Sequence, residues 1–254
     1  MQQFSEKTLD FLFQNRMHNS KAWFEEHKEE YKKLVLEPLQ DLVKYLTPTA
    51  LSIDSQLTTE PRVDKTISRI RRDTRFSHDK SLYRDTMWFI FRRGKMHGTS
   101  VPSLYFEITC DGFNYGSGFY CASTGYMDTL RRLVLQEDPH YIKAQEALCG
   151  NSLFHLEGEC YKHPHYKNAS PEKQNWLERR NICAIAESDD FDLLFSDQLA
   201  ETLRAGFLAV APLYAFFLHT AQVFQEQDPK NAALFGSRNS MEQPQFNGGR
   251  KDMW

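Results

Sequence analysis

The residues best suited to chemistry in this chain are the basic side chains between positions 62 and 93. This stretch holds ten Lys or Arg residues and four acidic residues, a local charge of +6 in a chain of net charge −3, so the remainder carries −9. Guanidinium and ammonium groups bind phosphates, carboxylates and nucleic-acid backbones through charge-assisted hydrogen bonds. A cationic segment on an acidic body therefore predicts a site for an anion.

The centre of this stretch, residues 69–85, interleaves basic and acidic side chains. We predict a ligand site there from eight residues: Arg69, Arg72, Asp73, Arg75, Asp79, Lys80, Tyr83 and Arg84. The five basic groups would hold the anion, the tyrosine would donate a hydrogen bond, and the two aspartates would orient the guanidinium groups. Ion-pair networks are often structural, so a salt-bridged surface loop is the competing interpretation.

Other candidate groups are weaker. Cys160, His163 and His165, with His155 nearby, suggest metal binding, but their spacing is too close for a zinc template and no second cluster completes it. We therefore assign no metal site. No nucleophile, P-loop or dinucleotide motif occurs, so catalytic residues and cofactor are left unknown. Two carboxylates could act as a general base, as could many others: Glu107 on a predicted strand and Asp111 in a predicted turn.

Two further features could contribute to a site. Gly116 and Gly118 interrupt an aromatic strand, which indicates either a ligand laid against bare backbone or tight packing of a ring such as Trp23. The segment Asn15–Asn19, which contains Arg16, precedes a helix, and helix N-termini attract anions. We expect this segment to lie beside the Arg-rich segment and to complete an anion site with it.

The elements that must position these residues can be predicted from their patterning. Runs rich in aromatic and β-branched residues predict strands over 87–93, 104–110, 113–121 and 181–187. Asp111-Gly112 predicts a hairpin with a type I′ turn between the second and third strands.

Amphipathic periodicity predicts helices on both sides of the strands. A short helix over 8–13 and a loop over 15–19 come first. A long helix then begins after Ser20, bends near Pro38 and ends before Pro48, with Trp23, Phe24 and Tyr31 in the core, and a polar loop covers 49–65. Later helices are predicted after Ser123, at Pro139, at Pro171 and from Asp197, the last with a kink at Pro212.

This order of elements predicts one α+β domain over 1–227, with a mostly antiparallel sheet flanked by long helices. Residues 228–254 are polar and are predicted to be a flexible tail. No apolar run approaches the ~20 residues that cross a bilayer, and the N-terminus lacks the features of a secretory signal. Five cysteines without a CxxC pair indicate reduced thiols, so we expect a soluble cytoplasmic protein without a membrane partner.

The Arg-rich segment also resembles a known family. Its pattern, R-x-x-R-D-x-R-F-S-x-D-K-x-x-Y-[KR], is similar to one in a widespread bacterial and fungal family of conserved proteins classed only as a domain of unknown function. The pattern falls on Arg69, Arg72, Asp73, Arg75, Phe76, Ser77, Asp79, Lys80, Tyr83 and Arg84. An Asn-rich loop before Trp23-Phe24 and a later Tyr31 resemble its N-terminal signature. The resemblance implies one α/β domain over most of the chain and implies no activity.

Three functions remain open from the sequence. The favoured one is an uncharacterised binding protein or enzyme for a small phosphorylated or carboxylated molecule, whose basic side chains would converge on one pocket. A nucleic-acid-associated protein is less favoured, because acids are interleaved with the bases and the rest of the chain is acidic. A structural or partner-binding module, in which the Arg/Asp segment ties the long helix to the sheet, is the third.

Overall fold

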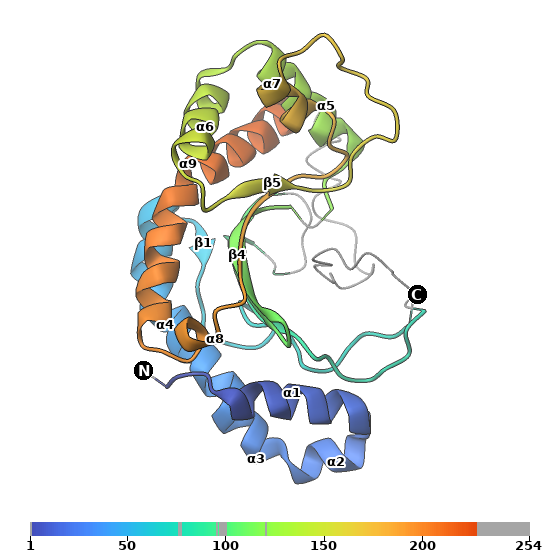
Figure 1. The fold of residues 1–254 in the computed structure, drawn as a ribbon, viewed down its shortest axis with the longest axis vertical. Coiled ribbons are helices and arrows are strands. Elements are labelled where there is room, and N and C mark those ends of the chain that lie inside the picture. Colours follow the sequence, from blue (N-terminus) through green and yellow to red (C-terminus); the bar gives the residue numbers. More distant parts are fainter. Residues whose placement is uncertain (1, 76–77, 95, 97–100, 120, 228–254) are drawn as a thin grey trace.

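The computed structural model describes residues 2–75, 78–94, 96, 101–119 and 121–227 (Figure 1). Its centre is a six-stranded sheet in the order β1-β2-β3-β4-β6-β5, with every neighbouring pair antiparallel. The strands are β1 (Leu57–Thr58), β2 (Met87–Arg93), β3 (Ser103–Thr109), β4 (Gly112–Gly118), β5 (His155–Glu157) and β6 (Cys183–Ser188). The predicted α+β domain with an antiparallel sheet is confirmed. The predicted tail, 228–254, lies outside the described residues.

The predicted hairpin joins β3 to β4, but its turn differs from the prediction. Thr109 pairs with Gly112, so Cys110 and Asp111 form the turn. A type I′ turn needs positive φ at both central residues, and neither of these two has it. The Thr109 hydroxyl instead accepts a hydrogen bond from the Asp111 amide at 3.1 Å, which stabilises the turn through a side chain. The type I′ prediction is therefore wrong.

Helices surround the sheet and begin largely where the predicted caps place them. They are α1 (Glu6–His18), α2 (Lys21–Glu26), α3 (Lys28–Tyr31), the π-helical segment η1 (Lys32–Leu36), α4 (Glu37–Ile53), α5 (Thr124–Leu135), α6 (Pro139–Gly150), α7 (Pro171–Leu177), α8 (Phe191–Leu194) and α9 (Gln198–Gln227). Ser20, Ser123, Asp138 and Ser170 each accept a backbone N–H at a helix start, and capping was predicted for all of these except Ser123.

Two boundaries in the N-terminal half were predicted wrongly. Helix α1 continues to His18, so the predicted loop over 15–19 reduces to a turn at Asn19, which has a φ of 46°. The long helix does not end before Pro48, because α4 runs through it to Ile53. The buried apolar stripe of α4 continues on both sides of Pro48, and this packing outweighs the one hydrogen bond that proline removes.

The core lies between one face of the sheet and helices α4 and α9. The Phe207 ring on α9 meets Phe89, Phe91 and Tyr115 of the sheet edge-on, with ring centres 6.1 to 6.5 Å apart. Tyr31 is buried, and Trp23 and Phe24 are partly buried beside this core. Strand alternation places Trp88, Tyr105, Glu107 and Asn114 on the opposite face, which therefore mixes aromatic and polar groups.

Helix α9 is long and apolar enough to span a membrane by length and composition. From the sequence, we expected no such segment. Half of its apolar window is buried inside the fold, where it packs against α4, α5, α6 and β4. The same apolar stripe therefore serves as the core helix of this domain.

Candidate functional site

The Arg-rich segment forms a two-sided arm that leaves the sheet beside β2. The backbone amide of Arg72 donates to the carbonyl of Leu82 at 2.8 Å, and that of Arg84 donates to Ile70 at 3.0 Å. Positions 76–77, near the tip, lie outside the described residues. Strand-like pairing at the base of the arm determines which side chains lie on the same face. The predicted site residues therefore form two groups, an exposed outer group and a more buried inner group.

The outer group consists of exposed side chains with local partners. Arg69 forms an ion pair with Asp64, and Arg75 pairs with Asp73 at 2.6 Å. The hydrogen bonds from Arg75 lower the pKa of Asp73 to about 2. Lys80 donates to a backbone carbonyl within the arm at 2.9 Å. The side chains of Arg69 and Arg75 are 58% and 71% exposed, so the five basic groups do not converge on one point.

The inner group centres on Asp79. Its carboxylate accepts hydrogen bonds from Arg16 at 2.7 Å, from Arg72, and from the amide and hydroxyl of Ser81 at 2.9 and 2.5 Å. These bonds hold the pKa of Asp79 well below its usual range, and the bond from Arg16 has the largest effect. The side chain of Arg72 is only 8% exposed. Asp79 therefore joins the arm to α1 through Arg16 and joins the two sides of the arm through Arg72.

Three more contacts join the arm to α1, to α2 and to the turn between them. Arg16 also donates to the carbonyl of Tyr83 at 3.0 Å, and the Asn19 side chain accepts from the Leu82 amide at 2.6 Å. The rings of Phe24 and Tyr83 stack with centres 5.0 Å apart. The predicted proximity of the 15–19 segment to the Arg-rich segment is confirmed. These contacts give Arg16, Asn19 and Tyr83 a supporting role for the arm.

Arg84 differs from every other base in the arm. Its side chain turns onto the sheet, where the guanidinium carbon lies 4.5 Å from the centre of the Trp88 ring. The residue is 4% exposed, and its Nε is buried without a hydrogen-bond partner in the described part of the chain. Burial, assisted by the charge of Arg72, lowers the pKa of Arg84 to about 10, so the group stays cationic at neutral pH.

A buried carboxyl lies beside this cation. Glu107 on β3 pairs in register with Trp88 on β2 and with Asn114 on β4, and it is 1% exposed. The Asn114 amide donates to Oε2 of Glu107 at 3.2 Å. Burial raises the pKa of Glu107 to about 7, although Asn114 and Arg84 act to lower it. This carboxyl therefore gains and loses a proton near neutral pH, as a general acid or base does.

No ion pair within 4.0 Å joins Glu107 to Arg84 among the described side chains. The charge of Arg84 lowers the pKa of Glu107 through space, without a direct ion pair between the two groups. A buried guanidinium with an unmet N–H, beside a carboxyl that can carry a proton, is suited to bind an anion.

The two strand glycines have a structural explanation. A Cβ at Gly116 would overlap the carbonyl oxygen of Ala184 on β6, and one at Gly118 would overlap Cys183. The group that lies close to these glycines is therefore the backbone of the neighbouring strand β6. Trp23, the ring considered for this position, stacks between His18 and His27 instead.

A pocket of about 400 Å³ lies elsewhere, lined by side chains of α5 and by Tyr166. Its buried cation, Arg131, is already bound by the carbonyls of Leu177 and Arg179 at 2.9 and 2.6 Å and by Asp128 at 2.7 Å. These bonds occupy its guanidinium, so this pocket offers a weaker anion site than Arg84 does.

Sequence reasoning identified Arg84 but not its surroundings. Glu107 was one carboxylate among many, and Trp88 and Asn114 were not singled out. The available signal was period-two alternation on three neighbouring strands, which puts Trp88, Glu107 and Asn114 in one row once the register is known.

The fold and this polar sheet face define an α+β domain with an Arg-rich arm beside its sheet. Residues 7–216 match the family described as conserved hypothetical protein (DUF2461), and the chain belongs to this family. No curated protein matches the chain significantly.

Proposed function

We propose that this protein binds a small ligand bearing a phosphate or carboxylate group at the sheet face where Arg84 lies over Trp88. The observation that supports the proposal is the state of Arg84, a buried cation whose Nε has no hydrogen-bond partner in the described structure. A buried charge without a partner is strongly destabilising, and perturbed ionisable groups cluster at functional sites. An anion would supply the missing acceptor, and a guanidinium binds such groups in a bidentate manner.

Glu107 supplies the proton chemistry of the proposed site. With a pKa of about 7, its carboxyl can be neutral when an anion binds nearby and can take up a proton on binding. The same group would act as general acid or base if the ligand is a substrate. Both side chains are buried, so the proposed site requires a local opening of the structure for a ligand to reach them.

The proposal assigns different roles to the eight residues predicted from the sequence. Arg84 contacts the ligand, and Arg72 adds positive charge nearby. Asp79 and Tyr83 hold the arm in place, which is the scaffold role considered for this segment. The outer residues Asp73, Arg69, Arg75 and Lys80 are outside the site. Contact with nucleic acid is supported only by the charge of these exposed bases.

The cytoplasmic location belongs to the same proposal. All five cysteines are free thiols, and two of them, Cys110 and Cys183, are at least partly buried. Reduced thiols are typical of a reducing compartment.

The test is a thermal-shift titration with inorganic phosphate, followed by nucleotides, sugar phosphates and organic acids. A ligand that binds only the folded protein raises its melting temperature. We expect one anion class to stabilise the wild type and the control Arg75→Gln, which removes an exposed outer base, but not Arg84→Gln. Equal responses of the two variants, or no response of the wild type to any anion, would contradict the proposal.

A further inference from the structure

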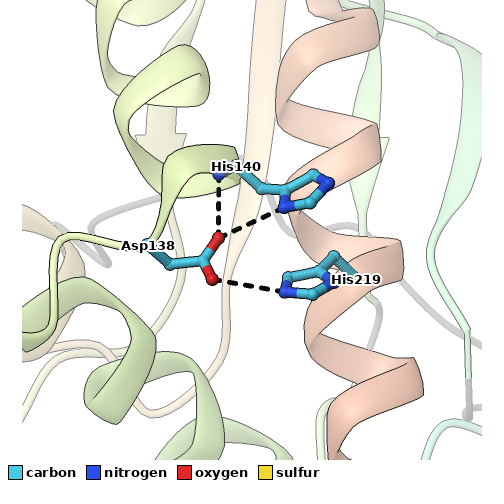
Figure 2. Close-up of side chains that lie close together, drawn as sticks. All are labelled: Asp138, His140 and His219. Atoms are coloured by element: carbon cyan, nitrogen blue, oxygen red, sulfur yellow. Dashed lines mark hydrogen bonds and ion pairs between the residues drawn. The ribbon is translucent and has the colours of Figure 1, made fainter.

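A second group of chemically active side chains lies at the junction of α6 and α9. Asp138 precedes α6, His140 is in its first turn, and His219 comes from the second half of α9 (Figure 2). The junction lies at the opposite end of the molecule from α1 and α2, which hold the Arg-rich arm (Figure 1). Nothing proposed for Arg84 and Glu107 therefore depends on it.

We propose that Asp138, His140 and His219 bind a divalent transition-metal ion of the zinc class. One carboxylate and two imidazoles, with a water molecule in the fourth position, form a donor set that zinc takes in proteins. The Nδ1 of His140 lies 3.2 Å from Oδ1 of Asp138, and the Nε2 of His219 lies 3.4 Å from Oδ2. One ligand atom from each residue can be chosen so that all three lie within 4.8 Å of one another.

These separations fit a small coordination sphere. Zinc–ligand bonds of about 2.0–2.1 Å at tetrahedral angles place neighbouring ligand atoms about 3.3 Å apart. The two carboxylate–imidazole separations are close to this length, each to a different oxygen of Asp138. The ion would take the place of the direct contacts between the carboxylate and the two rings.

One adjustment is required. The rings of His140 and His219 are stacked, with centres 4.0 Å apart and planes inclined by 19°. Two rings stacked in this way cannot both direct a lone pair at one ion, so one ring must turn. His140 is the residue that can turn, because its side chain is 47% exposed, whereas that of His219 is 25% exposed.

Helix capping explains only part of this arrangement. Oδ1 of Asp138 accepts a hydrogen bond from the amide of His140 at 2.8 Å, which is an N-cap and fixes the carboxylate. The cap does not require His219, which is 79 positions beyond His140 and faces the other carboxylate oxygen. The cap instead holds one ligand in place for an ion that would join α6 to α9.

The histidine-rich loop noted in the sequence does not form a comparable group. Cys160 lies 3.8 Å from the Gly158 carbonyl, and the His165 ring stacks on Tyr161. In the described part of the chain, the three-residue metal-binding arrangement is the one at α6 and α9. The loop is therefore a suitable control.

The test uses the full chain, freed of metal by a chelator, and titrates Zn²⁺ by calorimetry at about pH 7.5. Co²⁺ is titrated in parallel, because its visible absorption reports tetrahedral coordination. We expect one ion per chain, a higher melting temperature with Zn²⁺, and at least about tenfold weaker binding in His219→Ala and Asp138→Asn. Asn is as good an N-cap as Asp, so Asp138→Asn keeps the helix start while removing the charged ligand.

The control combines Cys160→Ser, His163→Ala and His165→Ala, and its affinity should equal that of the wild type. Circular dichroism of the metal-free variants verifies that each is folded. The proposal is overturned if the wild type binds no Zn²⁺, if the control loses binding, or if folded His219→Ala and Asp138→Asn bind as tightly as the wild type.

Discussion

The guanidinium carbon of Arg84 lies over the ring of Trp88, 4.5 Å from its centre, and the two residues are four positions apart in the sequence. A cation over an indole ring is favourable, by about 0.5–2 kcal/mol. That contact does not replace the hydrogen bonds that a buried guanidinium gives up on leaving water. This unmet hydrogen bonding of Arg84 is the reason that we propose it as a ligand-binding residue.

This imbalance predicts that Arg84→Met stabilises the folded protein while removing its response to anions. Methionine keeps the apolar contact with Trp88 and removes an unpaired buried charge, so we expect unfolding to require about 1–2 kcal/mol more. Urea denaturation at neutral pH measures this. The exposed counterpart Arg75→Met should change stability by no more than about 0.5 kcal/mol. A less stable Arg84→Met would make Arg84 a structural residue.

Glu107→Gln should change how stability depends on pH. The pKa of Glu107 is raised from 4.5 to about 7, so between these values the folded state keeps a proton that the unfolded state has lost. The carboxyl therefore lowers the stability of the wild type progressively as pH rises from about 4.5 to 7. Glutamine has the same shape and no charge, so the variant should be more stable by roughly 1–3 kcal/mol at pH 8 and nearly equal at pH 4.5.

Denaturation curves of both proteins across this pH range test the prediction. Parallel slopes for wild type and Glu107→Gln would mean that folding does not raise the pKa of Glu107.

Asp79→Asn should loosen the arm. Its carboxylate pairs with Arg16 and Arg72, and the variant leaves the largely buried Arg72 without its anion. We expect a loss of about 1–2 kcal/mol at pH 7, a modest figure because the Asp79 side chain is 37% exposed. The depressed pKa implies that the stabilisation is present above about pH 4 and is lost as pH falls further.

Hydrogen exchange locates the effect of Asp79→Asn, since the amides of Arg72 and Arg84 should lose protection first. Asp73→Asn, which breaks only an exposed pair, is the matched control and should leave these amides protected. Equal protection in all three proteins would show that Asp79 does not hold the arm.

Tyr214→Phe should weaken the attachment of α9 to the sheet. The Tyr214 hydroxyl donates to Asp54 at 2.5 Å, and Arg93 of β2 donates to the same carboxylate at 2.6 and 3.0 Å. Asp54 also ends α4, so one carboxylate joins two helices and a strand. Loss of the hydroxyl should lower the unfolding free energy by about 1–2 kcal/mol in urea titrations. An unchanged midpoint would mean that Arg93 alone is sufficient for Asp54.

Local signals in the sequence were enough to predict most elements, whereas long-range contacts were not. Cap residues such as Asp138 and Ser170 act within one turn, so the starts of their helices could be read directly. Pro48 shows the limit, since the rule that proline ends a helix was overridden by packing of α4 against the core. β5 and α8 were missed because three- and four-residue elements carry too little periodicity to detect.

The site was predictable only as a region. The charge of the arm pointed to Arg84, but its neighbours come from β2, β3 and β4, and their register depends on the whole sheet. The ion-pair partner of each basic side chain could not be predicted either. Arg69 and Arg75 are the same residue type as Arg84, and the side of the arm on which each lies follows only from the fold. The approach of His219 to Asp138 has no counterpart in the sequence, since it depends on how α6 packs on α9.

The sheet ends in very short strands, two residues in β1 and three in β5, and short edge strands offer few backbone groups for pairing with a second molecule. The part of β2 that β1 leaves open is covered by the chain just before the arm, where Ser68 donates to Trp88 at 2.9 Å and Ile90 donates to Thr66 at 2.8 Å. Without this cover, the aromatic strand β2 would offer an edge for pairing with a second molecule. The segment that leads into the arm thus also covers the edge of β2, so we expect damage to the base of the arm to appear first as aggregation.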